Sequence, residues 1–163
     1  MLQIKVEQLT AEAFAPFGRF FNMDDPSGYA LEGALHKFYP DRIRDSYTAQ
    51  VGFSAIRVRK PEKMIIDAVE YHTTTSEIIM PINGDMILHV APASNGVPVT
   101  ELTKVFIVPK GTMVQMNPGV WHLCPLPVEV DELHALIVLA ECTYANDCTV
   151  VNLTEDQQFE IVR

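Results

Sequence analysis

The sequence predicts an all-β fold, a small barrel or sandwich, and three observations lead to this prediction. Short apolar runs rich in Val, Ile, Leu and Met recur from residue 51 to residue 139. Turn-forming Pro, Gly, Asn and Asp residues separate these runs at close intervals. The run Ile56-Arg57-Val58-Arg59 alternates apolar and charged residues, as a half-buried strand does.

A short helical segment and a loop are expected before most of the strands. Residues 10–17 are expected to form a short helix, because Thr10 can cap its N-terminus and Pro16 with Gly18 limits its length. Residues 22–33 are rich in Asn, Asp, Pro and Gly and are expected to form a loop. The expected strands are residues 51–59, 64–69, 77–81, 86–90, 105–108, 113–116 and 133–139.

Turn signals and the C-terminal residues complete the expected organisation. Asn83-Gly84 is a strong signal for a hairpin between the strands on either side of it. Residues 154–157 could cap a last helical turn, and residues 159–162 could equally form an edge strand. No repeat or linker divides the chain, and its 48% hydrophobic content fills one core, so we expect a single domain over residues 1–163.

Composition and charge restrict the partners and the compartment. The formal net charge of −9 opposes unspecific binding to nucleic acid or to an anionic membrane. Cys124, Cys142 and Cys148 form no Cys-x-x-Cys pair, so we expect free thiols in a reducing compartment. Residues 1–6 lack the apolar core of a signal peptide, and the longest apolar stretch, residues 135–140, is too short to span a bilayer. We therefore expect a cytoplasmic protein with no nucleic-acid or membrane partner.

Two histidines and two carboxylates are the candidate site residues. Glu70 and His72 are two residues apart, so in a strand they point to the same face. Glu77 opens the next expected strand and returns to the same barrel mouth if the two strands pair antiparallel. His122 follows Gly119 in a separate turn. Imidazole and carboxylate donors suit Mn, Fe, Ni, Zn or Co, so Glu70, His72, Glu77 and His122 are predicted metal ligands; ordinary surface polar groups are the alternative.

Other reactive residues have plainer interpretations. His36 either lines the mouth or lies in solvent, and His134 is expected to be structural. His89 either points into the barrel or is a hydrogen-bonded histidine of the core or surface. Trp121 is expected to pack at the mouth, with a substrate-contacting wall as the alternative. Cys124 is expected to be a buried inert thiol, with a metal-ligating or catalytic thiol as the alternative.

The spacing of the candidate residues resembles the first conserved motif of the cupin barrels. That motif runs from a His-x-His pair through a Glu to a Gly. His72 matches its second His, Glu77 its Glu and Gly84 its Gly, whereas Glu70 stands in place of its first His.

The second cupin motif is matched in part downstream. Gly111, Gly119 and His122 occupy its Gly, Gly and His positions, whereas Asn117 replaces its Pro and Leu126 its final Asn. The two motifs together imply a cupin-type double-stranded β-helix, which is a jelly-roll barrel, here with a short N-terminal helix and a metal ion inside.

Within the cupins, the chain resembles the ureidoglycolate lyase family. Glu70-x-His72 and Gly119-x-Trp121-His122 are the patterns that carry this resemblance, which covers the chain from about residue 7 to residue 140. Three further stretches are similar in the same order: residues 9–18, 89–92 and 119–126. Two positions differ, because Tyr71 stands where the family usually has Arg and Glu77 where it usually has Gln.

The resemblance implies a metal-dependent lyase that cleaves ureidoglycolate, or a related small 2-hydroxy acid, to glyoxylate and urea. Chelation of this anionic substrate by a divalent ion (Ni, Mn, Zn or Fe) would lower the pKa of its hydroxyl group. Glu77, or less favourably Tyr71, would take the hydroxyl proton, and His122 completes the predicted catalytic set.

Other functions remain open from the sequence. Another metal-cupin enzyme, such as an isomerase or dioxygenase, would keep the fold and change the chemistry, and a small-molecule-binding cupin would lack catalysis. Analogy with the family further implies a homodimer, in which an apolar N-terminal strand could exchange between subunits.

Overall fold

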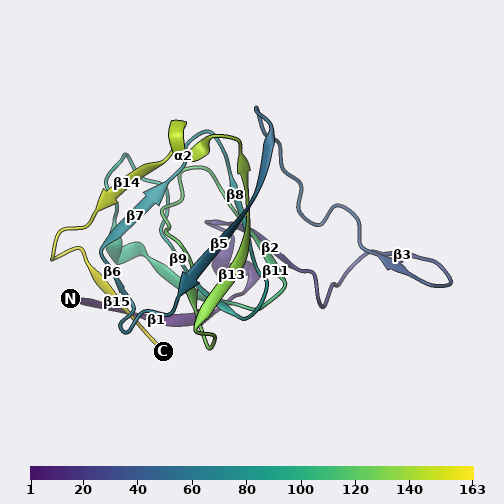
Figure 1. Ribbon diagram of the computed structural model, residues 1–163, viewed down its shortest axis with the longest axis horizontal. Helices are drawn as coiled ribbons and strands as arrows, with labels where there is room; N and C mark the ends of the chain where they lie inside the picture. Colours follow the sequence, from purple (N-terminus) through teal and green to yellow (C-terminus); the bar gives the residue numbers. More distant parts are fainter.

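Two curled sheets surround the main apolar core in the computed structural model, which describes residues 1–163 (Figure 1). The six-stranded sheet has the order β12 (Leu126–Pro127), β9 (Met86–Val90), β10 (Lys104–Val108), β1 (Leu2–Gln8), β15 (Phe159–Val162) and β6 (Ile65–Ile66). The five-stranded sheet has the order β2 (Gly18–Asn22), β11 (Thr112–Met116), β8 (Glu77–Pro81), β13 (Glu132–Ala140) and β5 (Val51–Arg59). The predicted all-β barrel is confirmed.

Smaller elements complete the fold. β7 (Ala68–Tyr71) pairs antiparallel with β14 (Thr149–Asn152), and β3 (Leu31–Glu32) pairs antiparallel with β4 (Lys37–Phe38). The helical segments are α1 (Ala11–Phe14), the 3-10 turn η1 (Thr100–Leu102) and α2 (Thr143–Asn146). None of these helices has the length and apolar character needed to cross a membrane.

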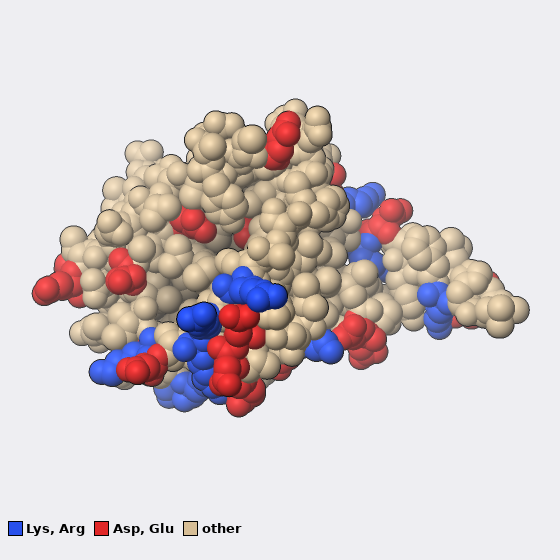
Figure 2. Space-filling view, in the orientation of Figure 1, with Lys and Arg blue, Asp and Glu red and all other residues tan.

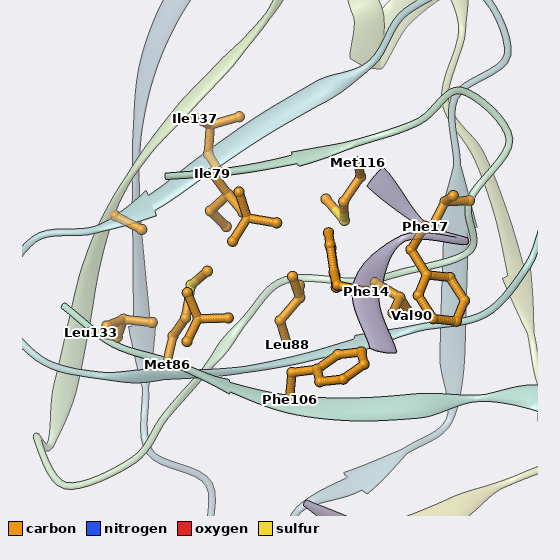
Figure 3. Close-up of a cluster of buried hydrophobic side chains, with 14 of the residues drawn as sticks. Phe14, Phe17, Ile79, Met86, Leu88, Val90, Phe106, Met116, Leu133 and Ile137 are labelled. Carbon is orange, nitrogen blue, oxygen red and sulfur yellow. The ribbon is translucent and has the colours of Figure 1, made fainter. Parts of the chain in front are cut away.

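The main core receives side chains from both sheets and from α1 (Figure 3). Phe14 of α1 packs edge-on against Phe106 of β10, with ring centroids 5.5 Å apart. Leu88 of the six-stranded sheet and Ile79 of the five-stranded sheet join the same cluster. Because side chains alternate along a strand, the other face of the six-stranded sheet supplies a second apolar cluster, which includes Phe159.

Most predicted strands are confirmed to within one residue at each end: β5, β8, β9, β10, β11 and β13. The strand predicted over residues 64–69 is instead divided into β6 and β7, which belong to different sheets. The helix predicted over residues 10–17 is a single turn, α1, and Thr10 caps it, since Thr10 Oγ1 accepts a hydrogen bond from the Ala13 N–H at 3.2 Å.

The hairpin predicted at Asn83-Gly84 is wrong. β8 pairs with β11 and β13 in one sheet, whereas β9 pairs with β10 and β12 in the other. Asn83 Oδ1 accepts a hydrogen bond from the His134 N–H at 2.8 Å, so its side chain fixes the beginning of β13. A Cβ on Gly84 would lie 2.9 Å from the Val130 side chain. Glycine therefore allows a close crossing between sheets here and does not form a hairpin turn.

The first and last strands lie side by side in the six-stranded sheet. β1 runs parallel to both β10 and β15 and lies between them, so the N-terminal strand is paired within its own chain (Figure 1). β15 also pairs with β6, so residues 159–162 form a strand but not the predicted edge.

Residues 23–50 leave the barrel as an extended arm that carries the β3–β4 hairpin (Figure 1). The loop predicted over residues 22–33 is therefore the first part of a longer excursion. The arm returns to the barrel at Asp45, whose carboxylate accepts hydrogen bonds from the side chains of Ser76 and Gln115. Its exposed large apolar residues are Met23, Tyr29, Leu31, Leu35 and Phe38.

Candidate metal centre

The four predicted ligands, Glu70, His72, Glu77 and His122, meet in one cluster. Glu70 lies in β7, His72 follows that strand, and Glu77 is the first residue of β8. The backbones of Glu70 and His122 form a bridge, in which the Glu70 N–H donates to His122 O at 2.7 Å and the His122 N–H donates to Glu70 O at 2.9 Å. This bridge joins the two predicted motifs.

Three side chains of the cluster offer donor atoms within reach of a single ion. One donor atom each from Glu70, His72 and His122 lie within 4.8 Å of one another. Glu77 Oε2 lies 3.2 Å from the Nε2 atoms of both histidines. The two histidines and Glu77 are buried, and Glu70 is half-buried. The structure thus brings together all four residues predicted as metal ligands.

The turn that precedes His122 depends on Gly119. Its φ of +83° lies in the left-handed region, which side chains other than glycine rarely adopt. The Gly119 N–H donates to His72 O at 2.6 Å, so the turn passes directly against the first motif. Gly119 therefore helps to hold the two histidine segments together.

Glu77 reaches the cluster although the strands that hold Glu70 and Glu77 do not pair with each other. The antiparallel pairing that was the condition for its expected return is not formed, because β7 pairs with β14 whereas β8 pairs with β11 and β13. Residues 73–76 connect the two strands as a turn, and Thr75 and Ser76 in it are buried. This turn leads from β7 to a strand of a different sheet, yet Glu77 lies on the face shared by Glu70 and His72.

Backbone carbonyls fix both imidazole rings. His72 Nδ1 lies 2.9 Å from Asp147 O, and His122 Nδ1 lies 2.9 Å from Val120 O. Because a carbonyl oxygen only accepts hydrogen bonds, each Nδ1 must carry the proton. The two Nε2 atoms, which face Glu77, are therefore either protonated against that carboxylate or free to bind a cation.

The residues present fit a divalent ion. His72 Nε2 is buried and makes no hydrogen bond, although it lies 3.2 Å from Glu77 Oε2, because the contact lacks hydrogen-bond geometry. A buried polar atom left without a partner is costly, and a cation would satisfy it. Two imidazole nitrogens with carboxylate oxygens are a donor set for Mn, Fe, Co, Ni or Zn.

Charges within the cluster stabilise one another. Burial acts to raise the pKa of Glu77, but the hydrogen bond with His122 and the proximity of His72 outweigh it and lower that pKa to about 2. Burial acts to lower the pKa of both histidines, but their contacts with Glu77 raise it. The carboxylate thus attracts positive charge to both rings, and a metal cation can replace that charge.

A family model for ureidoglycolate lyase matches residues 1–160. The chain belongs to the ureidoglycolate lyase family. The ureidoglycolate lyase of Pseudomonas syringae pv. syringae is 29% identical over 163 residues, which cover 96% of this chain and 94% of the relative. The ureidoglycolate lyase of Rhodobacter capsulatus is 28% identical over 141 residues, which cover 84% of this chain and 86% of the relative. The protein is an enzyme of this family, as the sequence resemblance implied.

Solved structures confirm the cupin-type barrel. The dTDP sugar isomerase from Desulfovibrio desulfuricans G20 has a TM-score of 0.51 at 8% identity, over 87% of this chain and 89% of that chain. The dTDP-6-deoxy-D-glucose-3,5-epimerase RmlC from Legionella pneumophila Philadelphia 1 has a TM-score of 0.51 at 13% identity, over 85% of this chain and 80% of that chain. At these identities the similarity concerns the fold alone.

Tyr71 is the one predicted site residue that the structure keeps out of the cluster. Its side chain alternates with those of Glu70 and His72 along the chain, and its ring packs against Trp121 with centroids 4.4 Å apart. Trp121 is buried, and its Nε1 donates to Ser94 Oγ at 2.8 Å, so its expected packing role is confirmed. The position where the ureidoglycolate lyase family usually has Arg thus faces the second apolar cluster.

The remaining histidines lie outside the cluster. His89 is buried beside Phe159, with ring centroids 5.6 Å apart, and its Nε2 has no hydrogen-bond partner. Burial, with a smaller contribution from the charge of His122, lowers the pKa of His89 to about 3. His36 is exposed on the arm, and His134 Nε2 lies 3.0 Å from Glu132 Oε1, so His134 forms a surface ion pair when protonated.

Sequence reasoning missed the connection between β13 and β14, which supplies three contacts to the cluster. Asp147 O accepts the hydrogen bond from His72, and Cys148 Sγ donates to Glu70 Oε2 at 3.2 Å. The Tyr144 ring packs edge-on against His72, with centroids 5.9 Å apart. No local pattern marks these residues, because only the pairing of β14 with β7 brings them to the cluster.

Proposed function

We propose that this protein is a metal-dependent lyase that cleaves ureidoglycolate to glyoxylate and urea. The observation that carries the proposal is the convergence of two imidazole Nε2 atoms on a buried carboxylate, with Glu70 beside them. This cluster lies in a chain that matches the ureidoglycolate lyase family over residues 1–160. The family suggests the substrate, and the cluster offers the groups that its cleavage needs.

Glu70, His72 and His122 are the proposed ligands of a divalent ion. When bound, such an ion supplies a Lewis acid that lowers the pKa of the substrate hydroxyl. The ion would also place positive charge where an anionic substrate binds, in a chain whose net charge of −9 otherwise repels such a substrate. Ni, Mn, Zn and Fe all accept these nitrogen and oxygen donors.

Glu77 is the proposed proton acceptor. The hydroxyl proton of ureidoglycolate passes to the Glu77 carboxylate, the electron pair left on the oxygen forms the second bond of the glyoxylate carbonyl, and the C–N bond breaks with its electron pair passing to the urea nitrogen. Glu77 then returns the proton to the departing urea nitrogen, so that the reaction balances. Glu77 is buried, and its Oε2 lies 3.2 Å from the Nε2 atoms of both histidines, so its carboxylate faces the proposed ion site.

The direct test measures glyoxylate and urea from ureidoglycolate with metal-loaded and metal-stripped protein. We expect turnover that is lost on chelation and restored by adding back one of the candidate ions. No turnover by metal-loaded protein would exclude the substrate. Equal turnover after verified removal of metal would exclude the dependence on an ion while keeping the lyase activity.

We also propose a homodimer that forms through the arm and the outer face of the five-stranded sheet. β5 has a strand neighbour on one side only. Phe53 of β5 pairs with Val138 on the face opposite the core and is 74% exposed, and Leu35 at the tip of the arm is 98% exposed. In the view of Figure 2, uncharged residues cover most of the outer part of the arm. A two-fold axis lets such an apolar patch meet its own copy, so a second copy is the proposed occupant.

Each subunit is proposed to be a single cytoplasmic domain over residues 1–163. Val58 packs against both apolar clusters, which supports one folding unit. Cys124, Cys142 and Cys148 are free, which supports a reducing compartment. A fluorescent fusion and one cooperative unfolding transition would test the two expectations.

A further inference from the structure

The connection from β13 to β14 lies against the cluster and is itself firmly held. Thr143 is buried, and its Oγ1 donates to Ala140 O at 2.7 Å, which fixes α2 to the end of β13. β14 then lies beside β7 (Figure 1). Their register places Thr149 opposite Tyr71 and Val150 opposite Glu70. This register brings residues 147 and 148 beside His72 and the turn that follows it.

Asp147 contacts the segment of His72 through its side chain and its backbone. Its carboxylate accepts hydrogen bonds from the Thr73 N–H at 2.9 Å, the Thr73 hydroxyl at 2.7 Å, the Thr74 N–H at 2.8 Å and the Thr74 hydroxyl at 2.6 Å. Its carbonyl accepts the Nδ1–H of His72 at 2.9 Å. The carboxylate therefore holds the carbonyl at a fixed place relative to the imidazole ring.

Cys148 makes the corresponding contact with Glu70. Its Sγ donates to Glu70 Oε2 at 3.2 Å, and no other side chain makes a hydrogen bond to that carboxylate. A single donor on one oxygen orients the carboxylate and leaves the second oxygen available to the cluster. Consecutive residues thus contact the ligand side chains of Glu70 in β7 and of His72 just after it.

We infer that Asp147 and Cys148 are positioning residues of the metal centre. Asp147 fixes the ring of His72 so that Nε2 faces the ion, and Cys148 fixes the carboxylate of Glu70. The inference rests on the proposed function of the cluster as a metal centre. Partners of this kind hold metal ligands in their binding orientation, and their loss typically weakens metal affinity about ten- to a hundredfold.

The first test titrates full-length, metal-free protein with cobalt(II) and follows its visible absorption, which reports affinity and ligand geometry without turnover. We expect Asp147→Ala to weaken binding about ten- to a hundredfold. Asp131→Ala, at an exposed aspartate away from the cluster, is the matched control and should bind as the wild type does. If Asp147→Ala does not fold, Asp147→Asn keeps one acceptor oxygen and should show a smaller loss in the same direction.

The same titration separates positioning by Cys148 from ligation. Cys148→Ser keeps an O–H donor and should bind cobalt(II) as the wild type does, whereas Cys148→Ala should bind about tenfold more weakly. Cys142→Ala, at an exposed cysteine, is the control. A thiolate-to-cobalt charge-transfer band that disappears in both Cys148 variants would make Cys148 a ligand and overturn its positioning role.

A second measurement needs no ion. Heteronuclear NMR of the His72 ring, above its pKa, shows which nitrogen carries the proton. We expect Nδ1 in the wild type and exchange between both nitrogens in Asp147→Ala. An unchanged tautomer together with unchanged cobalt(II) affinity would overturn the inference for Asp147.

The two measurements distinguish failure of the positioning roles from failure of the proposed metal centre. Wild-type protein that binds no cobalt(II), nor any other candidate ion, would contradict the metal centre itself and with it the inference. Wild-type protein that binds cobalt(II) with the same affinity as Asp147→Ala and Cys148→Ala would contradict the positioning roles alone.

Discussion

The metal-centre cluster buries the ionisable side chains of His72, Glu77 and His122 inside the barrel, whereas the arm of residues 23–50 exposes large apolar side chains to solvent. Both regions depart from the usual distribution of side chains between core and surface, in opposite directions. The cluster offsets the cost of burial by pairing Glu77 with two imidazoles. In the arm, no part of the same chain covers the exposed apolar side chains.

This difference is the reason why two kinds of partner are proposed for the same molecule. Buried donors that converge on one point suit a small cation, because the surrounding chain already excludes water and holds the donors in place. Exposed apolar side chains on an extended segment suit a large partner that removes them from water. The experiments below should affect one region and leave the other unchanged.

Removal of His122 should have the largest effect, and only on the cluster. His122→Ala takes away an Nε2 donor and leaves the arm intact. Loss of a residue that only positions a ligand weakens metal affinity by up to about a hundredfold, so loss of a ligand should weaken cobalt(II) affinity by more than that. Turnover should also be lost. His134→Ala, at a surface histidine, is the matched control. Cobalt(II) binding by His122→Ala at wild-type affinity would remove His122 from the ligand set.

Substitution of Glu77 should separate catalysis from metal binding within the cluster. Glu77→Gln keeps the shape and removes the proton-accepting charge, so kcat should fall about a hundred- to ten-thousandfold while cobalt(II) affinity is largely kept. Glu132→Gln at the surface should change neither quantity. A parallel loss of affinity and of kcat would identify Glu77 as a fourth ligand and exclude it as the base.

Charges placed on the apolar surfaces should affect assembly and spare the cluster. Leu35→Asp and Phe53→Asp should each weaken the homodimer by about 1.5–3 kcal/mol, the usual value of one buried large apolar side chain. Sedimentation velocity over a dilution series measures the shift toward monomer. Val97→Asp, at a residue that is 63% exposed but lies outside the arm and β5, is the control. A wild-type protein that is monomeric throughout would refute the dimer.

Acid should destabilise the barrel through His89. Its pKa is about 3 in the fold, because of burial, and its ordinary value is 6.5. Between these values the unfolded chain binds a proton that the folded chain excludes. The free energy of unfolding should therefore decrease as the pH falls through this range, by up to about 1.4 kcal/mol per pH unit.

Urea unfolding at about pH 7 and about pH 5 would measure this slope. His89→Phe should reduce the pH dependence, whereas His134→Ala should keep it. A variant without His89 that loses as much stability on acidification as the wild type would show that other groups cause the effect.

Removal of the Tyr71 hydroxyl should have the smallest effect. Tyr71→Phe keeps the ring that packs against Trp121 and leaves the cluster unchanged, so kcat/KM should stay within about twofold of the wild type. Steady-state kinetics with ureidoglycolate give this ratio. A decrease comparable to that of Glu77→Gln would return Tyr71 to the catalytic set.

Local patterns predicted the strands and the four residues of the cluster well. β8, β9 and β5 coincide with apolar runs bounded by Pro, Gly or Asn. Such runs predict strands without information from the rest of the chain. Glu70 and His72 share a face for the same local reason, since side chains alternate along a strand. Where a property depends on a few neighbouring residues, the sequence was sufficient.

Strand pairing was predicted poorly, because it depends on residues far apart in the chain. Asn83-Gly84 has the composition of a hairpin turn, yet tertiary packing directs β8 and β9 into different sheets. The β7–β14 pairing, which brings Asp147 and Cys148 to the cluster, joins segments separated by most of the barrel sequence. The residue pattern of one segment alone does not show which distant segment it pairs with.

The placement of β1 also has a consequence for the order of events during translation. β1 precedes all the other strands in chain order, yet its two neighbours are β10 and β15, and β15 follows all the others. Leu2 to Lys5 therefore stay without their β15 partners until synthesis reaches Phe159–Val162. The cluster likewise cannot form until His122 and β14, the strand that follows Cys148, have been synthesised. The complete cluster therefore forms only after the segment from Glu70 to Asn152 has been synthesised.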